Sequence, residues 1–431
     1  MPLKSFSKIY NPHSVHRLPT LPAKFFTDGY ALTVTDEFIK KRCVVLIEDY
    51  EPIDIAQRFA MFQKGLRQFM QTWHVAVRFS SVKMAANNVV AVWHVETKAP
   101  NWQVNTEFRL LNWSDLVKGD FRRWRFDRIL RAGKAFANFV TSGTCWRYVR
   151  TSWRFGLLFL YPVLAAFLFS VVGLVLAVLL ATLNVPFALL IGLIFGVGLF
   201  AAYVKWLDPF ELPRVVDLWV FLYDLVHLKR TGLAERLGVF SQDIIAKLQS
   251  NDYDEIVVIG HGIGAALQPI ILDRVFFALP DFDKRDGRSV NVLSLGSLLL
   301  AVGLHPDGAW LVSPTLRIAV DRMVYWAEYQ AEEDALSFAG RNPVDELVQE
   351  QHGKPILQKI RIKDMVDSGT KGRFRDATYQ NHLQPIQANS KRYFYDYFMV
   401  CCGPFALPTR VKYADHMVTA FAPDGRLNSN S

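Results

Sequence analysis

The chain has few cysteines, and none is spaced as a metal ligand or a disulfide partner would be. Its 431 residues include only four, Cys43, Cys145, Cys401 and Cys402, and these form no CxxC pair. The count excludes a disulfide framework, and nothing in the spacing predicts a zinc site, another metal or a cofactor. A reducing compartment is the expectation for such a chain.

The amino terminus also lacks a targeting signal. The stretch MPLKSFSKIYNPHSVHRLPT contains no apolar run of the length that a secretory signal needs. We therefore expect the soluble part of the chain not to be carried across a membrane. The composition, with 51% hydrophobic and 21% charged residues, is too apolar for an ordinary soluble protein and too charged for a polytopic membrane protein. It fits a chain that is part soluble and part membrane.

Residues 155–204 contain no charged side chain. A helix that spans a bilayer needs about 20 apolar residues, so this run is long enough for two spans. Near its middle lies Asn184-Val185-Pro186, and proline cannot continue the helix that precedes it. We therefore predict helices over Gly156–Thr182 and Phe187–Val204, joined by a tight turn, with a buried soluble hairpin as the alternative. The chain then divides into an amino-terminal part, a hairpin and a carboxyl-terminal part, at 1–154, 155–205 and 206–431.

The charge missing from the hairpin is concentrated just before it. Between Asp115 and Arg154 there are ten Lys or Arg against three Asp, a net of +7 out of the chain's +9. A positive excess beside a spanning segment marks the cytoplasmic side, and Lys205 after the second helix agrees. We therefore expect both ends of the hairpin and the soluble parts to be cytoplasmic, at the inner membrane of a cell.

Within this basic stretch, FRRWRFDRILRAGKAF over 121–136 interleaves aromatic residues with arginine. The pattern favours an amphipathic helix that lies on anionic lipid headgroups. A nucleic-acid patch has the same composition, and a solvated basic helix is a further alternative. The position beside a membrane segment favours lipid. The expected partners are membrane lipids, through 155–205 and 115–154, and no nucleic acid, while the oligomeric state stays open.

The segments on either side of the hairpin alternate between strand and helix patterns. A buried strand over Cys43–Ile47 precedes an amphipathic helix, and a helix over Leu233–Leu248 precedes an apolar strand at 256–259. Alternating strands and helices predict an α/β fold with a mostly parallel sheet flanked by helices. In such sheets, ligand sites form at the carboxyl ends of the strands. Further strands are expected at HVAVRF, NVVAVWHV, TEFRLL, VNVLSLG, RMVYWAEYQ and ILQKIRI.

The stretch IVVIGHGIGAALQ, Ile256–Gln268, runs from an apolar strand through a glycine-rich turn into a helix. In the pattern glycine-x-nucleophile-x-glycine, the middle position carries a serine on a sharp turn. Here that position is Gly262. The segment VVIGHGIGA resembles the elbow of the α/β-hydrolase superfamily, in its lipase and esterase branch, with the serine changed to glycine. The resemblance extends over about residues 40–110 and 210–405 and is motif-specific at the elbow alone.

The resemblance implies a set of site residues. The family's order of nucleophile, acid and histidine corresponds here to Gly262, to Asp334 after the strand RMVYWAEYQ, and to His382 in NHLQPIQ. Asp345 is an alternative acid and His416 an alternative histidine. A solvated loop acid and a surface or capping histidine are the ordinary alternatives for Asp334 and His382.

The resemblance also implies an oxyanion hole. It would use the backbone N–H of Ile263 and a second donor from the loop Asp49-Tyr50-Glu51, which we take as Tyr50. Family members often have a glycine near that loop, and Asp49 departs from this pattern. A carboxylate close to a developing oxyanion would raise the energy of that oxyanion.

Glycine at position 262 has no side chain with which to attack an ester, so covalent acyl transfer through this position is impossible. The first hypothesis is therefore a membrane-anchored, α/β-hydrolase-like protein without ordinary serine-hydrolase activity, which binds an acyl-ester or lipid ligand or acts as a scaffold. The alternative is an active hydrolase of acyl esters or lipids that uses an activated water or a displaced nucleophile. Ser294 and Ser297 are candidates for the latter, and His261 is expected to be a packing residue.

The segment GHGIGA also satisfies the dinucleotide-binding pattern G-x-G-x-x-[G/A]. That pattern requires an Asp or Glu at the end of the next strand, to hold a ribose hydroxyl. The next strand ends LSLGS without an acid, and Asp281, Asp283 and Asp286 fall in the loop before it. A dinucleotide-binding oxidoreductase is therefore the third hypothesis.

Overall fold

The computed structural model describes residues 38–85, 88–122, 125–280, 290–348, 350, 352–367 and 377–428. Its centre is a nine-stranded sheet in the order β2-β4-β5-β1-β6-β7-β8-β9, with β3 paired to β4 outside this path. The strands from β5 to β9 along this order pair in parallel, and β2, β3 and β4 add an antiparallel edge. The predicted α/β class with a mostly parallel sheet is confirmed. The strands are β1 (Lys41–Ile47), β2 (Ala76–Phe79), β3 (Lys83–Ala85), β4 (Val90–Lys98), β5 (Gln103–Leu111), β6 (Glu255–His261), β7 (Val290–Leu295), β8 (Val324–Ala331) and β9 (Ile356–Ile360).

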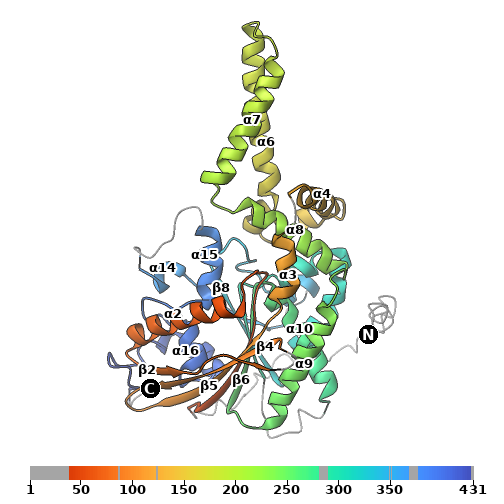
Figure 1. Ribbon diagram of the computed structural model, residues 1–431. Helices are drawn as coiled ribbons and strands as arrows, with labels where there is room; N and C mark the ends of the chain where they lie inside the picture. The colour runs from red at the N-terminus through yellow and green to blue at the C-terminus, as the bar shows by residue number, and fades with distance from the viewer. Residues whose placement is uncertain are drawn as a thin grey trace.

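Helices cover both faces of the sheet (Figure 1). Successive side chains of a strand point to opposite faces, so Val45 of β1 packs in one core cluster and Val44 in the other. The first cluster contains residues of α8, α9 and α10, and the second contains residues of α2 and α16. The helices of the body are α2 (Ile55–Trp73), α3 (Ser114–Phe121), α8 (Leu212–Val226), α9 (Leu233–Ser250), α10 (Ile263–Ala278), α11 (Leu299–Gly303), α12 (Val312–Val320), α13 (Pro343–Val348), α14 (Ile362–Met365), α15 (Ala377–Leu383), α16 (Tyr397–Cys402) and α17 (Leu407–Lys412). Short 3-10 turns lie at Pro306–Leu311, Gln384–Ile386 and Ala414–His416.

Helix α2 shows how local sequence sets an element. The side chain of Asp54 accepts a hydrogen bond from the backbone N–H of Gln57, and the Gln57 side chain returns to the N–H of Asp54. This capping box satisfies two amide groups that a helix start would leave unpaired. The helix then buries Phe62, Leu66 and Phe69, which lie at spacings of three and four along one face.

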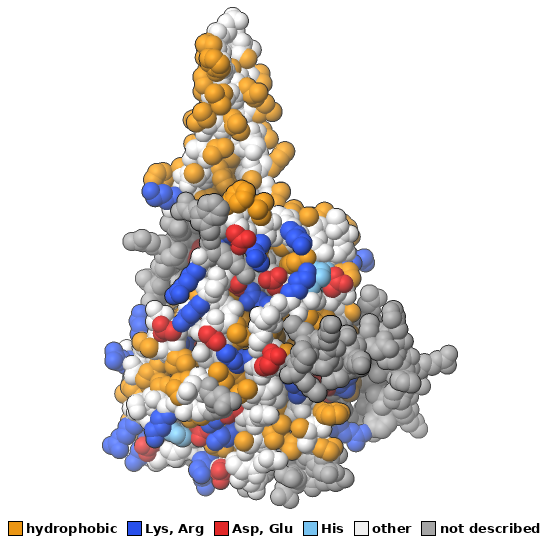
Figure 2. Space-filling model, turned by 45° about the vertical axis from the view of Figure 1, so that its right-hand side comes forward, with side chains coloured by type: hydrophobic (Ala, Val, Ile, Leu, Met, Phe, Trp, Pro, Cys, Tyr) orange, Lys and Arg blue, Asp and Glu red, His pale blue; other side chains and the backbone are white. Residues whose placement is uncertain are grey.

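Two long apolar helices, α6 (Trp153–Thr182) and α7 (Ala188–Trp206), project from the body as a hairpin (Figure 1). Both are long and apolar enough to cross a membrane. Their large side chains face outward, so that Phe167 is 67% and Leu189 71% exposed, and Figure 2 shows hydrophobic side chains along the whole projection. The two predicted helices and the turn between them are confirmed, with each boundary within a few residues of the prediction.

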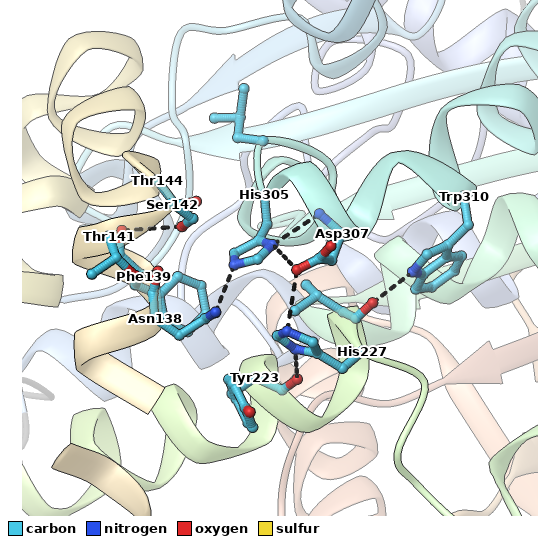
Figure 3. A network of polar contacts seen from close by, with 12 residues as sticks. Asn138, Phe139, Thr141, Ser142, Thr144, Tyr223, His227, His305, Asp307 and Trp310 are labelled. Atoms are coloured by element: carbon cyan, nitrogen blue, oxygen red, sulfur yellow. Dashed lines mark hydrogen bonds and ion pairs between the residues drawn. The ribbon is translucent and has the colours of Figure 1, made fainter. Parts of the chain in front are cut away.

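The basic segment before the hairpin forms helices α4 (Arg125–Thr141) and α5 (Thr144–Thr151). Helix α4 is docked on α8, where Nε of Arg128 lies 2.8 Å from Oδ1 of Asp217. At its other end, Asn138 belongs to a polar network with His305 that ties α4 to the body (Figure 3). The outer side of α4 exposes the apolar side chains of Ile129 and Leu130 beside Arg131. Two residues of the predicted aromatic and arginine pattern, Arg123 and Trp124, lie outside the described residues.

Candidate functional site

The glycine-rich turn joins β6, at the centre of the parallel strands, to α10. Gly262 lies at this turn with φ 54° and ψ −115°, a backbone conformation that glycine adopts at little cost and other residues do not. Its N–H donates to the carbonyl of Leu295, and its own carbonyl accepts from the N–H of Leu298, both at 3.0 Å. The chain therefore holds a sharp strand-to-helix turn at the position where the sequence predicts one.

Asp334 and His382 meet beside this turn. Asp334 follows the end of β8, and His382 lies on α15. Nδ1 of His382 is 2.8 Å from Oδ2 of Asp334, and both side chains are buried. The structure thus brings together the acid and the histidine that the sequence selects, although they are 48 residues apart.

Gly296, after β7, makes room for this pair, and sequence reasoning missed it. A side-chain carbon at this position would lie 3.1 Å from both Oδ2 of Asp334 and Cε1 of His382, and its φ of 52° is unfavourable for other residues. The sequence LSLGS at the end of this strand was considered only as a source of an acid or a nucleophile. Its glycine, directly after a strand, was the signal that could have identified this position.

Asp49 fills the space beside Gly262 and the first amide of α10. It follows β1, which is hydrogen-bonded to β6 in the sheet. Its Oδ1 accepts a hydrogen bond from the N–H of Ile263 at 2.6 Å, and its Oδ2 lies 3.2 Å from Nε2 of His382. A side-chain carbon added to Gly262 would overlap this carboxylate. The carboxylate therefore bridges the histidine and the first amide of α10.

Two carboxylates next to His382 favour its cationic form. Burial alone would lower the pKa of His382, but the charges and hydrogen bonds of Asp334 and Asp49 outweigh it and raise that pKa well above its usual value. Burial acts to raise the pKa of Asp49, yet the hydrogen bond and charge of His382, with the N–H of Ile263, lower it to about 2. In this arrangement His382 has no free nitrogen with which to accept a proton from a nucleophile.

His261, the residue between the two glycines of the turn, contacts the same group. Its Nε2 lies 2.8 Å from the backbone carbonyl of His382, and the two rings are 4.6 Å apart between centroids. Burial first, and then the charge of His382, lower the pKa of His261 to about 4. Its Nδ1 is buried and has no hydrogen-bond partner among the described residues. The ring packs as the sequence predicts, but it also leaves one nitrogen unsatisfied.

A second buried charge group lies next to Asp49 along the chain. Arg58 of α2 forms ion pairs with both Glu48 and Glu51, and all three side chains are buried. Burial raises the pKa of Glu48 to about 7, against the opposing effect of Arg58. This arginine is therefore shared by two carboxylates and is not available to Asp49.

The other predicted candidates are engaged elsewhere. Asp345 on α13 accepts a hydrogen bond from the N–H of His352, and His416 is exposed in its 3-10 turn. Ser294 donates to Gln268 and accepts from Trp326, and Ser297 accepts from the N–H of Leu299, so both act as core or turn residues.

Tyr50, predicted to supply the second oxyanion donor, bonds through its hydroxyl to Oδ2 of Asp120 at 2.9 Å. Whether its backbone N–H has the predicted role stays a prediction. The structure places Asp49 of the same loop, instead, against Ile263. Of the loop acids considered for a ribose, Asp281, Asp283 and Asp286 lie outside the described residues.

A cavity that is open to solvent lies beside Asp49 and His382. Arg214, from the start of α8, stacks over the ring of Tyr379 at 3.7 Å and pairs with Glu211 at its edge. Because α8 comes directly after the hairpin, the cavity lies between the buried charges and the root of the two apolar helices. The remaining wall is largely apolar and includes Phe121, Phe210, Val215, Leu218, Leu298 and Leu336.

Comparisons of the chain with protein-family models, with curated proteins and with solved structures find no match.

Proposed function

We propose that this chain is a membrane-anchored, α/β-hydrolase-like protein that binds an acyl-chain ligand at the membrane surface and does not carry out serine-type hydrolysis. The observation that carries the proposal is the apolar cavity, which joins the buried Asp49–His382 pair to the root of the hairpin. Ligand cavities in proteins are mostly apolar, with a few polar groups that fix the orientation of the ligand. The mostly apolar lining of this cavity, with Asp49, Arg214 and His382 among its polar groups, fits that description.

Two observations support the proposed absence of serine-type hydrolysis. Gly262 supplies no nucleophile, and the carboxylate of Asp49 takes the space of any side chain at that position. The acid–histidine pair is nevertheless kept, with His382 held between Asp334 and Asp49. The acid–histidine pair is present but no nucleophile is available at position 262, and this combination favours ligand binding over catalysis.

The membrane part of the proposal has the hairpin as its support. Helices α6 and α7 expose large apolar side chains along their length. Contact of such a surface with water is unfavourable, whereas the hydrocarbon core of a membrane accommodates it. The net positive charge of 115–154 favours a cytoplasmic body at an inner membrane. The outer side of α4, with its exposed apolar side chains and neighbouring arginines, is suited to the headgroup layer.

A displacement measurement tests the acyl-chain proposal. The full chain, held in amphipol, is titrated with a fluorescent long-chain fatty acid, and unlabelled fatty acid or phospholipid then displaces the probe. Leu336→Trp should fill the cavity and weaken binding at least tenfold, because Leu336 is a half-buried wall residue. Leu316→Trp on α12 is the matched control, since Leu316 is also half-buried but does not line the cavity. Equal binding by both variants would contradict the proposed site.

A further inference from the structure

A cluster of potential metal ligands lies beside the cavity, whose wall includes Asp49 and His382. A carboxylate oxygen of Asp49 and one ring nitrogen each of His261 and His382 lie within 4.8 Å of one another, and all three residues are buried. We propose that Asp49, His261 and His382 form a binding site for a divalent transition-metal ion such as Zn²⁺. This inference goes beyond the acyl-binding function and does not depend on it.

The spacing of the first two ligand atoms fits a bound ion. Oδ2 of Asp49 and Nε2 of His382 are 3.2 Å apart. Zinc binds imidazole nitrogen and carboxylate oxygen at about 2.0 to 2.2 Å in a tetrahedral arrangement. Two such ligands are therefore separated by roughly 3.3 Å, which follows from these bond lengths and the tetrahedral angle. An ion can replace the proton that these two atoms share without moving either of them far.

The third ligand explains an unsatisfied atom. Nε2 of His261 is taken by the carbonyl of His382, which leaves Nδ1 as the nitrogen with a free lone pair, buried and unpartnered among the described residues. Buried polar atoms in proteins nearly always have a hydrogen-bond partner, so a buried nitrogen without one calls for an explanation. His305 shows the ordinary case: its Nε2 contacts Asn138 and its Nδ1 accepts the N–H of Asp307, so both nitrogens are satisfied (Figure 3).

The charge of the cluster also favours a cation. Asp49 and Asp334 are two buried carboxylates that face a single imidazole, His382, which contributes one positive charge at most. Arg58 is already shared by Glu48 and Glu51, and Arg214 of the cavity wall is paired with Glu211. An unbalanced charge is costly in a buried site. A divalent ion bound to Asp49 and two neutral histidines, with Asp334 behind them, would leave no net charge.

Contacts around the ligands would orient them. Metal-binding histidines usually donate their second ring N–H to a carboxylate or a backbone carbonyl. Nδ1 of His382 is bonded to Asp334, and Nε2 of His261 to the carbonyl of His382, so both rings meet this condition. Asp49 and His382 line the cavity, which provides an entry path. Asp334 is a positioning residue in this arrangement.

The test uses the full chain in detergent, stripped with a chelator and titrated with Co²⁺ and Zn²⁺ alone. We expect one equivalent of Co²⁺ per chain, with the visible d–d absorption of a tetrahedral site, displaced by Zn²⁺. Asp49→Asn and His261→Gln should abolish this spectrum. Asp334→Asn should lower affinity by about 10 to 100 fold, the usual loss when the residue that is hydrogen-bonded to a metal ligand is changed. His416→Gln, which removes an exposed histidine, should leave binding unchanged.

Absence of a stoichiometric cobalt spectrum from the wild-type chain would overturn the metal site, whether or not the variants fold. Equal cobalt affinity in the wild type and Asp49→Asn would overturn it too. The cobalt titration contains no added lipid, so a negative result there does not affect the acyl-chain proposal. A negative result in the fatty-acid displacement likewise does not affect the metal-site proposal.

Discussion

The carboxylate of Asp49 reaches across from the end of β1 to lie 3.2 Å from Nε2 of His382 on α15, residues that are 333 positions apart. The same carboxylate accepts the first amide of α10, next to Gly262. A glycine at the turn and an aspartate in the neighbouring loop are therefore complementary: the space that one side chain lacks is filled by the other. A side chain at position 262 would therefore fit only if Asp49 were changed as well.

Gly262→Ser alone is expected to give no serine hydrolase. The new side chain would overlap the carboxylate of Asp49, and a φ of 54° is strained for serine. We expect a loss of roughly 1 to 3 kcal/mol in the free energy of unfolding and no labelling by a fluorophosphonate probe. The double variant Asp49→Ala/Gly262→Ser removes the overlap and frees Nε2 of His382, and labelling at position 262 should then appear.

Adding Asp334→Asn to that double variant is the control, because the histidine would lose the acid that orients it. Labelling of the single variant Gly262→Ser would show that Asp49 moves aside readily, contrary to the blocking role assigned to it.

The hairpin should depend on close backbone contact between α6 and α7. A side-chain carbon at Gly192 would overlap the carbonyl oxygen of Gly173, whereas one at Gly198 would have no described atom within 4 Å. Gly192→Val is therefore expected to destabilise the helix pair by about 1 to 3 kcal/mol, the usual cost of overpacking. Gly198→Val, in the same helix, is the matched control.

Disulfide cross-linking between cysteines introduced on facing positions of α6 and α7 measures the association. Equal cross-linking in the two variants would be evidence against close packing of the hairpin.

Glu328 in β8 should make stability depend on pH. Burial raises the pKa of this carboxyl from 4.5 to about 7, and Oε2 has no hydrogen-bond partner among the described residues. The folded chain thus holds a proton that the unfolded chain releases above about pH 4.5, so stability is full below that pH and falls as pH rises towards 7. The shift corresponds to roughly 3 kcal/mol, fully lost above pH 7.

Glu328→Gln should accordingly be more stable than wild type at pH 8 and nearly equal to it at pH 4.5, in denaturant titrations of the chain in detergent. Glu332→Gln, at an exposed glutamate one residue past β8, should show no such pH-dependent gain. A constant difference between Glu328→Gln and wild type across this range would refute the prediction.

Much of the architecture could be predicted because it depends on local patterns. The hairpin follows from a charge-free run and one Asn-x-Pro turn, and the strands follow from short apolar runs between turn residues. The pairing of Asp334 with His382 was accessible only through the resemblance at the elbow, which supplied the order of residues. Composition alone would have left both as surface groups.

The roles of Asp49 and His261 were not accessible in this way. Asp49 was noted as a departure in a loop, but its partner is set by β1 lying beside β6, a pairing between segments more than 200 residues apart. His261 read as a packing residue because a strand-end histidine usually is one. Its unpaired Nδ1 emerges only when the surrounding atoms are placed.

The sequence by itself determined the long apolar hairpin, the α/β class and the absence of a serine at the turn, since each is a property of residues close together in the chain. Only the tertiary structure decided what occupies the space beside Gly262, because that depends on which loops the sheet order brings to the carboxyl end of β6. The parallel register of β1, β6, β7 and β8 places Asp49, Gly262, Gly296 and Asp334 at one edge, and the buried charges there follow from that neighbourhood.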